Sequence, residues 1–192
     1  MKKINKIFIY ANNVTNQLKV ATSKYRNFSI IHRDYSKNFS NSFVEFINFA
    51  KKNKIPFFTN YKKNILKYKF DGFYIPSFER KFIYTNKPRI GSAHNFREIY
   101  QKINQKCKII FISPIFETSK NKKPLGIIKF NLLIMNFNAH FFALGGINSV
   151  TIKKIFLTKS QGIGGIRIIN NLNLFYKVSQ IKLSNKFDNG AL

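Results

Sequence analysis

The stretch IIFISPIFETSK, residues 109–120, shows the unit from which this chain is built. Its first four residues, Ile109 to Ile112, are all apolar and do not alternate with polar residues. Such a run is typical of a strand that is covered on both faces, as in a parallel sheet. The hydroxyl-rich residues that follow, from Ser113 to Lys120, predict a loop directly after the strand.

The same unit recurs along the chain. Seven further segments predict strands: Ile7 to Tyr10, Phe28 to Ile31, Ile55 to Phe58, Gly72 to Ile75, Arg89 to Gly91, His140 to Leu144 and Gly162 to Ile169. Amphipathic stretches between them predict helices. We therefore expect an α/β fold, a (β/α)₈ TIM barrel in one compact domain over residues 1–182, followed by a loose C-terminal tail at 183–192. An open, doubly wound sheet gives the same alternation and is the alternative.

Three of the predicted helices have readable signals. Asn95 followed by Glu98 predicts a capping box, in which each side chain accepts a free backbone N–H, and Asn148 or Ser149 predicts a second cap. The apolar residues recur at helical spacing. They are Phe39, Phe43, Phe46, Ile47 and Ala50 in the first helix, Phe96, Ile99 and Ile103 in the second, and Val150, Ile152 and Ile155 in the third.

Composition predicts a globular protein outside the membrane. A chain of 192 residues with 44% hydrophobic content is long enough for one packed core. Cys107 is the only cysteine, which permits no intrachain disulfide and predicts a reducing, cytoplasmic setting. The longest apolar region, residues 127–142, contains Lys129, three asparagines and His140, which would be costly to bury in a bilayer.

The formal net charge of +27 is the strongest compositional signal. A basic surface attracts polyanions, so nucleic acid is a legitimate hypothesis. The lysines, however, are scattered singly and in pairs, with no Arg-rich arm and no recognisable nucleic-acid-binding motif. We therefore expect a solvated basic surface and no nucleic-acid partner. The oligomeric state is not predicted by the sequence.

Three clusters follow predicted strands, where barrel enzymes assemble their sites. Ser113 to Lys120 offers hydroxyls and a lysine to a phosphate or pyrophosphate. Gly145-Gly146-Ile147-Asn148 lets the backbone approach an anion at a helix start. Gly162 to Arg167 ends in a fixed positive charge, and its glycine spacing is not that of a dinucleotide fingerprint. The loops after the seventh and eighth strands commonly form a phosphate site together, although surface loops or close strand packing would explain each cluster singly.

Two further side chains are candidates for chemistry. His94 follows the fifth strand and can act as a general acid, a general base or a hydrogen-bond donor; a structural histidine at a helix start is the alternative. Arg33 follows the second strand and can bind a phosphate or orient a ring; an exposed surface arginine is the alternative.

Three motifs occur in the order of a known family's signatures: Gly91-Ser92-Ala93-His94, Ser113-Pro114-Ile115-Phe116-x-Thr118 and Gly145-Gly146-Ile147. On these residues the chain resembles the thiamine phosphate synthases and the related thiazole tautomerases, most clearly over residues 90–169. Lys123-Pro124-Leu125-Gly126 is similar to the family's loop that ends in a turn. The N-terminal half contributes only His32-Arg33-Asp34-Tyr35, Asn60 and Asp71-Gly72.

The resemblance implies a transferase that joins hydroxymethylpyrimidine pyrophosphate to thiazole phosphate and releases pyrophosphate. Phosphorylated pyrimidine and thiazole molecules are then its partners. Arg33, His94 and Lys120 are the implied catalytic residues. Pyrophosphate would be held by Ser92, Thr118, Ser119 and Lys120 beside Arg33, the substrate would contact Asn60, and thiazole phosphate would be held by the backbone of Gly145, Gly146, Ile166 and Arg167.

The chain departs from the family pattern at three places, and the two that involve carboxylates concern magnesium. Tyr35 replaces a lysine, Asn60-Tyr61 replaces an Asn-Asp pair, and Glu79 is the nearest acid to the aspartate expected after the fourth strand. The family's carboxylates bind Mg²⁺, which neutralises a departing pyrophosphate. Glu79 is thus the one metal-ligand candidate, with Lys120 and Arg33 as cationic replacements. The alternatives are a tautomerase-like barrel that uses His94, or a diverged phosphate-ligand or nucleic-acid binder without synthase activity.

Overall fold

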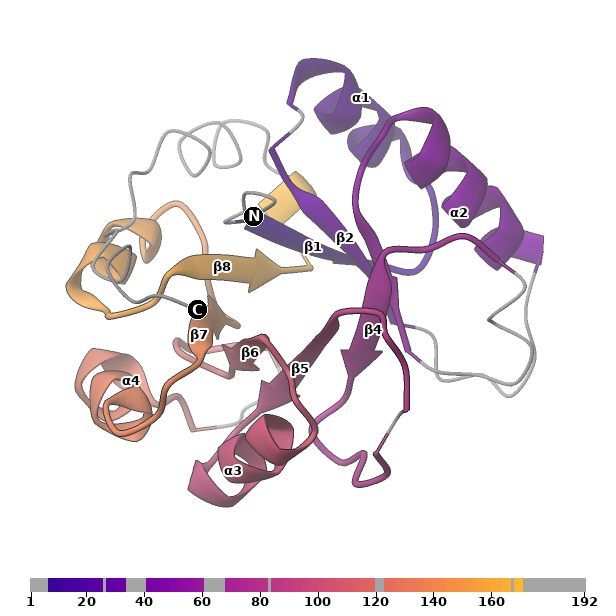
Figure 1. The fold of residues 1–192 in the computed structure, drawn as a ribbon. Helices are drawn as coiled ribbons and strands as arrows, with labels where there is room; N and C mark the ends of the chain where they lie inside the picture. The colour runs from indigo at the N-terminus through magenta and orange to yellow at the C-terminus, as the bar shows by residue number, and fades with distance from the viewer. Residues whose placement is uncertain are drawn as a thin grey trace.

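The chain folds into a closed barrel of parallel strands surrounded by helices (Figure 1). The computed structural model describes residues 7–25, 27–33, 41–60, 68–82, 84–119, 123–166 and 168–170. The strands are β1 (Ile7–Ala11), β2 (Ser29–His32), β3 (Phe57–Thr59), β4 (Gly72–Ile75), β5 (Arg89–Ala93), β6 (Ile109–Ile112), β7 (His140–Leu144) and β8 (Gly162–Gly165). β8 pairs with β1, with Phe8 opposite Gly164. This closure confirms the TIM barrel and rules out the open sheet.

Four α-helices and two 3₁₀ helices lie among the described residues. They are α1 (Asn16–Lys24), α2 (Asn41–Lys52), α3 (Phe96–Asn104), α4 (Gly126–Ile134), η2 (Ile152–Leu157) and η3 (Ile168–Asn170). Thr15 caps α1 by accepting a hydrogen bond from the backbone nitrogen of Leu18. Asn95 caps α3 through a 2.9 Å hydrogen bond from the backbone nitrogen of Glu98, as the sequence predicted.

Several predicted elements need correction. The fourth, sixth and seventh strands lie where predicted, but the eighth ends at Gly165, because the chain turns into η3 before Ile169. The predicted helix with Val150 is η2, which begins only at Ile152. Asn148 accepts the backbone N–H groups of Val150 and Thr151, so it caps a turn that precedes η2, and Val150 is 74% exposed. Phe39 and the tail at 183–192 lie outside the described residues.

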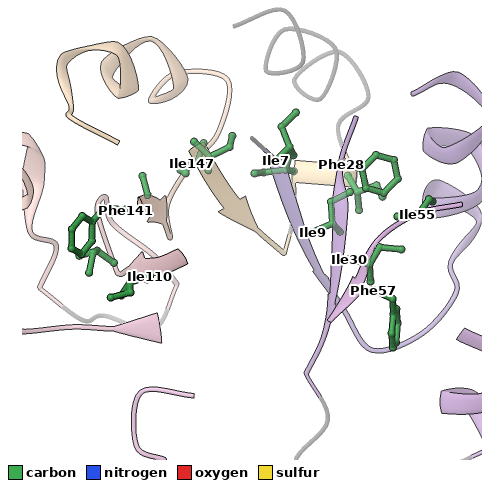
Figure 2. Packing of buried hydrophobic residues seen from close by; sticks show 14 of the residues in the cluster. Ile7, Ile9, Phe28, Ile30, Ile55, Phe57, Ile110, Phe141 and Ile147 are labelled. Atoms are coloured by element: carbon green, nitrogen blue, oxygen red, sulfur yellow. The ribbon is translucent and has the colours of Figure 1, made fainter. Parts of the chain in front are cut away.

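Both faces of the strands are buried, which explains their unbroken apolar sequences. Along β1, Phe8 and Tyr10 belong to the barrel interior, where the ring of Phe8 packs edge-on against Phe111 and Phe142. Ile7 and Ile9 belong to the outer core between barrel and helices. Figure 2 shows part of that outer core, including Ile7, Ile9, Phe28, Ile30, Ile55, Phe57, Ile110, Phe141 and Ile147.

The connection from β4 to β5 contains no helix among its described residues, 76–82 and 84–88. A complete (β/α)₈ barrel has a helix after every strand. Here an irregular segment covers that part of the barrel instead, and we refer to residues 76–82 as the strap. The described helices include none that is long and apolar enough to cross a membrane.

Candidate functional site

A cavity of about 410 Å³ opens beyond the carboxyl ends of β4, β5 and β6. The loops after these strands and the first turn of α3 line it with Ser77, His94, Glu98, Ser113, Pro114, Lys123 and Leu125. Its volume falls within the range of about 300–1,000 Å³ that is common for small-molecule sites. Because (β/α)₈ enzymes build their sites at this end of the barrel, the cavity is the candidate functional site.

Glu98 holds His94 at the cavity by two contacts. Its Oε2 accepts the backbone N–H of His94 at 2.8 Å and lies 2.9 Å from the ring nitrogen Nδ1. The predicted capping box is therefore modified, because the returning carboxylate binds His94 rather than the backbone of Asn95. A carboxylate only accepts hydrogen bonds, so the contact favours a proton on Nδ1 and leaves Nε2 as the basic nitrogen of the neutral ring. The side chain of His94 is 34% exposed and that of Glu98 is 27% exposed.

The loop after β6 packs directly on the glycines after β7. Gly145 and Gly146 have φ angles of 94° and 70°, which favour glycine. A Cβ on Gly146 would collide with the carbonyl oxygen of Glu117, and a Cβ on Gly145 would lie 3.5 Å from Cγ2 of Thr118. The backbone nitrogen of Phe116 donates to the carbonyl of Gly145 at 3.2 Å. The two predicted phosphate loops thus meet at one rim.

Ser92 and Arg33 are connected through two tyrosines at the barrel mouth. Ser92 is buried, and its Oγ lies 3.0 Å from the hydroxyl of Tyr74. The ring of Tyr74 packs edge-on against that of Tyr10, with centroids 5.5 Å apart. The guanidinium carbon of Arg33 lies 5.7 Å from the centroid of Tyr10. This arrangement places a fixed positive charge above an aromatic floor.

The remaining predicted residues follow other strands, lie in the strap or fall outside the described residues. Asn60 is buried directly after β3, Ser119 follows Thr118, and Ile166 follows β8 with 52% of its surface exposed. Glu79 lies in the strap, where Oε1 accepts the backbone N–H of Lys81 at 2.8 Å. Lys120 and Arg167 lie outside the described residues, as do Tyr35 and Tyr61.

The described residues do not fit a magnesium site. Mg²⁺ prefers several oxygen ligands in an octahedral arrangement. Among the residues that the structure describes, no three His, Cys, Asp or Glu side chains are grouped so that they could hold a metal. Glu79 caps its own turn and Glu98 is engaged by His94. Among the described residues, Glu79 therefore has no second side chain with which it could share a metal ion.

Sequence reasoning did not single out four residues of this region, Tyr10, Tyr74, Ser77 and Glu98 as a partner of His94, and it named Lys123 only as part of a family-like loop. Inward-facing tyrosines have the same sequence pattern as core aromatics, so only the closed barrel reveals their position. Ser77 and Lys123 lie in connecting segments, where a polar residue is ordinary. His94 and Glu98 are four residues apart at a helix start, a spacing that allows their side chains to meet. The sequence analysis instead assigned the Glu98 side chain to the capping box.

Known proteins resemble this chain in sequence and in structure. No protein-family model matches the chain. It is 35% identical over 95 residues to a thiamine-phosphate synthase of Prochlorococcus marinus subsp. pastoris, a match that covers 48% of this chain. A second thiamine-phosphate synthase, from another Prochlorococcus marinus strain, is 40% identical over 93 residues, or 47% of the chain. The chain is thus similar, over about half of its length, to thiamine-phosphate synthases.

The similarity covers part of the relatives in sequence and nearly the whole chain in structure. The chain covers about a quarter of the length of these curated relatives, 26% of each. A solved thiamine phosphate pyrophosphorylase from Pyrococcus furiosus superposes with a TM-score of 0.72 over 92% of both chains, at 14% identity. At that identity the likeness shows the barrel fold alone, and a fold does not imply an activity.

Proposed function

We propose that this protein is a transferase of the thiamine phosphate synthase type, which joins hydroxymethylpyrimidine pyrophosphate to thiazole phosphate and releases pyrophosphate. The observation that carries the proposal is the contact between the two phosphate loops. The loop with Thr118 lies on Gly145 and Gly146 at the carboxyl end of the barrel. One rim can thereby hold the phosphates of both substrates close enough to react.

The pyrophosphate end would lie at the loop after β6. Ser113 and Lys123 line the cavity, and Thr118 and Ser119 follow in the same loop. Hydroxyl and ammonium donors suit the oxygens of a polyphosphate. Lys120 and the buried Ser92 would complete this subsite on the strength of the family resemblance. With 34 basic and 7 acidic residues, the chain also provides a positive field that attracts such anions.

In the proposed reaction the bond between the pyrimidine methylene carbon and the pyrophosphate oxygen breaks, and pyrophosphate leaves with the electron pair. The thiazole nitrogen then donates its lone pair to the methylene carbon of the resulting cation. Arg33 would stabilise the negative charge that develops on the leaving group, since a guanidinium forms charge-assisted hydrogen bonds with phosphate oxygens. The rings of Tyr10 and Tyr74 would line the adjacent floor.

The thiazole phosphate would lie at the loops after β7 and β8. The positive φ angles of Gly145 and Gly146 allow the backbone to approach a ligand closely, which a side chain would prevent. Ile166 and Arg167 would complete this subsite from the end of β8. Loops after the last two strands are a frequent phosphate site in barrels of this kind.

A second candidate function is supported by the pair of His94 and Glu98. A histidine whose Nδ1 proton is oriented by a carboxylate is suited to transfer protons through Nε2. A tautomerase-like enzyme that keeps the thiazole phosphate subsite would use such a pair. This candidate requires no pyrophosphate chemistry.

A synthase assay distinguishes the two functions. Purified protein is incubated with both synthase substrates, either with magnesium or with a chelator, and thiamine phosphate is quantified. Lys108 is an exposed lysine remote from the cavity, so Lys108→Met is the control. The synthase is supported if Arg33→Met makes no thiamine phosphate while Lys108→Met still makes it. No product under either condition, with retained binding of thiazole phosphate, rejects the synthase and favours the tautomerase-like enzyme. Salt-sensitive RNA binding without binding of thiazole phosphate would reject both.

A further inference from the structure

The strap is fastened to α3 by Lys102 and Gln105. Nζ of Lys102 donates to the carbonyl oxygen of Glu79 at 2.8 Å. Nε2 of Gln105 donates to the carbonyl oxygens of Glu79 and Lys81, each at 3.0 Å. The two side chains are also joined to each other, because Nζ donates to Oε1 of Gln105 at 2.9 Å. We call this pair the latch.

The latch is buried although it is polar and charged. Lys102 has 0% and Gln105 3% of its surface exposed. The stem of Lys102 lies on β5, since a Cβ on Gly91 would be 2.8 Å from its Cδ. Its ammonium donates to a backbone carbonyl and to an amide oxygen. Burying a charge in this way is costly, so stability alone would be served better by an apolar side chain. The hydrogen bonds of the latch instead determine where the strap lies.

The strap forms one wall of the cavity. It follows β4 directly, and its Ser77 lines the cavity together with His94 and Glu98. The backbone nitrogen of Glu79 donates to the carbonyl of Pro76 at 3.1 Å, so a short turn links the latched carbonyl to Ser77. One helix therefore holds both sides of the cavity. The first turn of α3 carries Glu98, and its C-terminal end carries the latch.

We propose that Lys102 and Gln105 are positioning residues that hold Ser77 as the cavity wall opposite His94, and that this wall contacts the pyrophosphate group of the substrate. The proposal rests on the proposed synthase function for the identity of the ligand only. In this barrel the latch takes over the role of the helix that would otherwise follow β4 and support its loop.

Hydrogen exchange measured by mass spectrometry tests the mechanical half of the proposal. Lys102→Met and Gln105→Leu are compared with Lys108→Met, which removes the same charge from an exposed position close in sequence. We expect exchange at residues 77–82 to rise about tenfold in both latch variants while β6 and β7 stay protected. Unchanged exchange in the strap overturns the proposal, as does an even rise throughout the barrel. Lys102→Gln, which retains an N–H donor, replaces Lys102→Met if that variant does not fold.

Calorimetric titration with inorganic pyrophosphate tests the functional half. We expect Kd to rise about fivefold or more in both latch variants and to stay within about twofold of wild type in Lys108→Met. A loosened strap with unchanged Kd overturns the positioning role. A wild-type protein that binds no pyrophosphate overturns the ligand assignment and weakens the synthase proposal itself, while the exchange data still decide whether the latch holds the strap.

Discussion

Oε2 of Glu98 lies 2.9 Å from Nδ1 of His94 and 2.8 Å from the backbone nitrogen of the same residue. One carboxylate therefore fixes both the main chain and the ring of a histidine at the mouth of the barrel. The same Glu98 donates its backbone N–H to the cap Asn95. One turn of the chain thus both caps the helix and orients a candidate acid–base residue.

Replacement of His94 distinguishes a chemical from a structural role. If the ring transfers protons, His94→Gln lowers kcat by about 100-fold or more, since general acid–base catalysis commonly contributes that much. Glu98→Gln keeps an oxygen that can accept the backbone N–H but removes the charge beside Nδ1, so we expect a smaller loss. Steady-state kinetics of whichever activity the protein shows, synthase or tautomerase, measure both. Full activity of His94→Gln would exclude the ring from the mechanism.

Replacement of Gly146 tests the contact between the two phosphate loops. Gly146→Ala places a methyl group against the carbonyl of Glu117 and also strains a backbone with φ of 70°. Gly126→Ala is the matched control, since its φ is 69° but no atom lies within 4 Å of the added Cβ. We expect Gly126→Ala to cost about 1 kcal/mol of unfolding free energy. Gly146→Ala should cost more and weaken thiazole phosphate binding. Equal effects of the two variants on stability and binding would contradict the close packing of Glu117 on Gly146.

The cap at Asn95 is expected to contribute to the free energy of unfolding. Asn95→Ala removes the acceptor for the backbone N–H of Glu98, so we expect a loss of about 1 kcal/mol in the free energy of unfolding. Asn95→Asp retains an acceptor and should remain within a few tenths of wild type. Urea denaturation followed by circular dichroism provides the measurement. A wild-type midpoint in Asn95→Ala would show that the cap does not limit stability.

The buried Lys102 predicts a pH dependence of stability. Burial lowers the pKa of its ammonium from 10.5 to about 8, while Cys107, Glu79 and Glu98 oppose that shift. Between these two pKa values the unfolded chain binds more protons than the folded one, so Lys102 makes stability rise with pH over this window. We expect that rise between pH 7.5 and about 9 in Cys107→Ala, and not in Cys107→Ala/Lys102→Met. Urea titrations at several pH values measure the free energy of unfolding of both variants. The same pH dependence in both would contradict the prediction.

Cys107 should resist modification in the folded protein. Burial raises the pKa of its thiol to about 12, against the opposing influence of Lys102 and Arg89. Because the thiolate is the reactive form, a thiol reagent at pH 8 should label Cys107 only as fast as the barrel opens. Stopped labelling followed by mass spectrometry measures the rate, with guanidinium-unfolded protein as the control. Rapid labelling of the native protein would show that the thiol is accessible.

Much of the fold could be predicted because it depends on local signals. The predicted strands at residues 72–75, 109–112 and 140–144 match the structure to the residue, since each is a short run that is largely buried on both faces. The cap of α3 was predicted because an asparagine and the N–H it accepts are three residues apart. The eighth strand was overextended, because the apolar Ile168 and Ile169 look the same in a strand and in the buried turn of η3.

The sequence by itself determined the alternation of strands and helices, the cap at Asn95 and the glycine pairs at the ends of strands, because each depends on residues a few positions apart. Only the tertiary structure decided that β8 closes on β1, that Glu117 lies against Gly146, and that Lys102 reaches the carbonyl of Glu79. These contacts join residues far apart in the chain, and their partners are backbone atoms, which have the same chemistry at every position. No side-chain pattern encodes them, so the closed barrel has to bring them together.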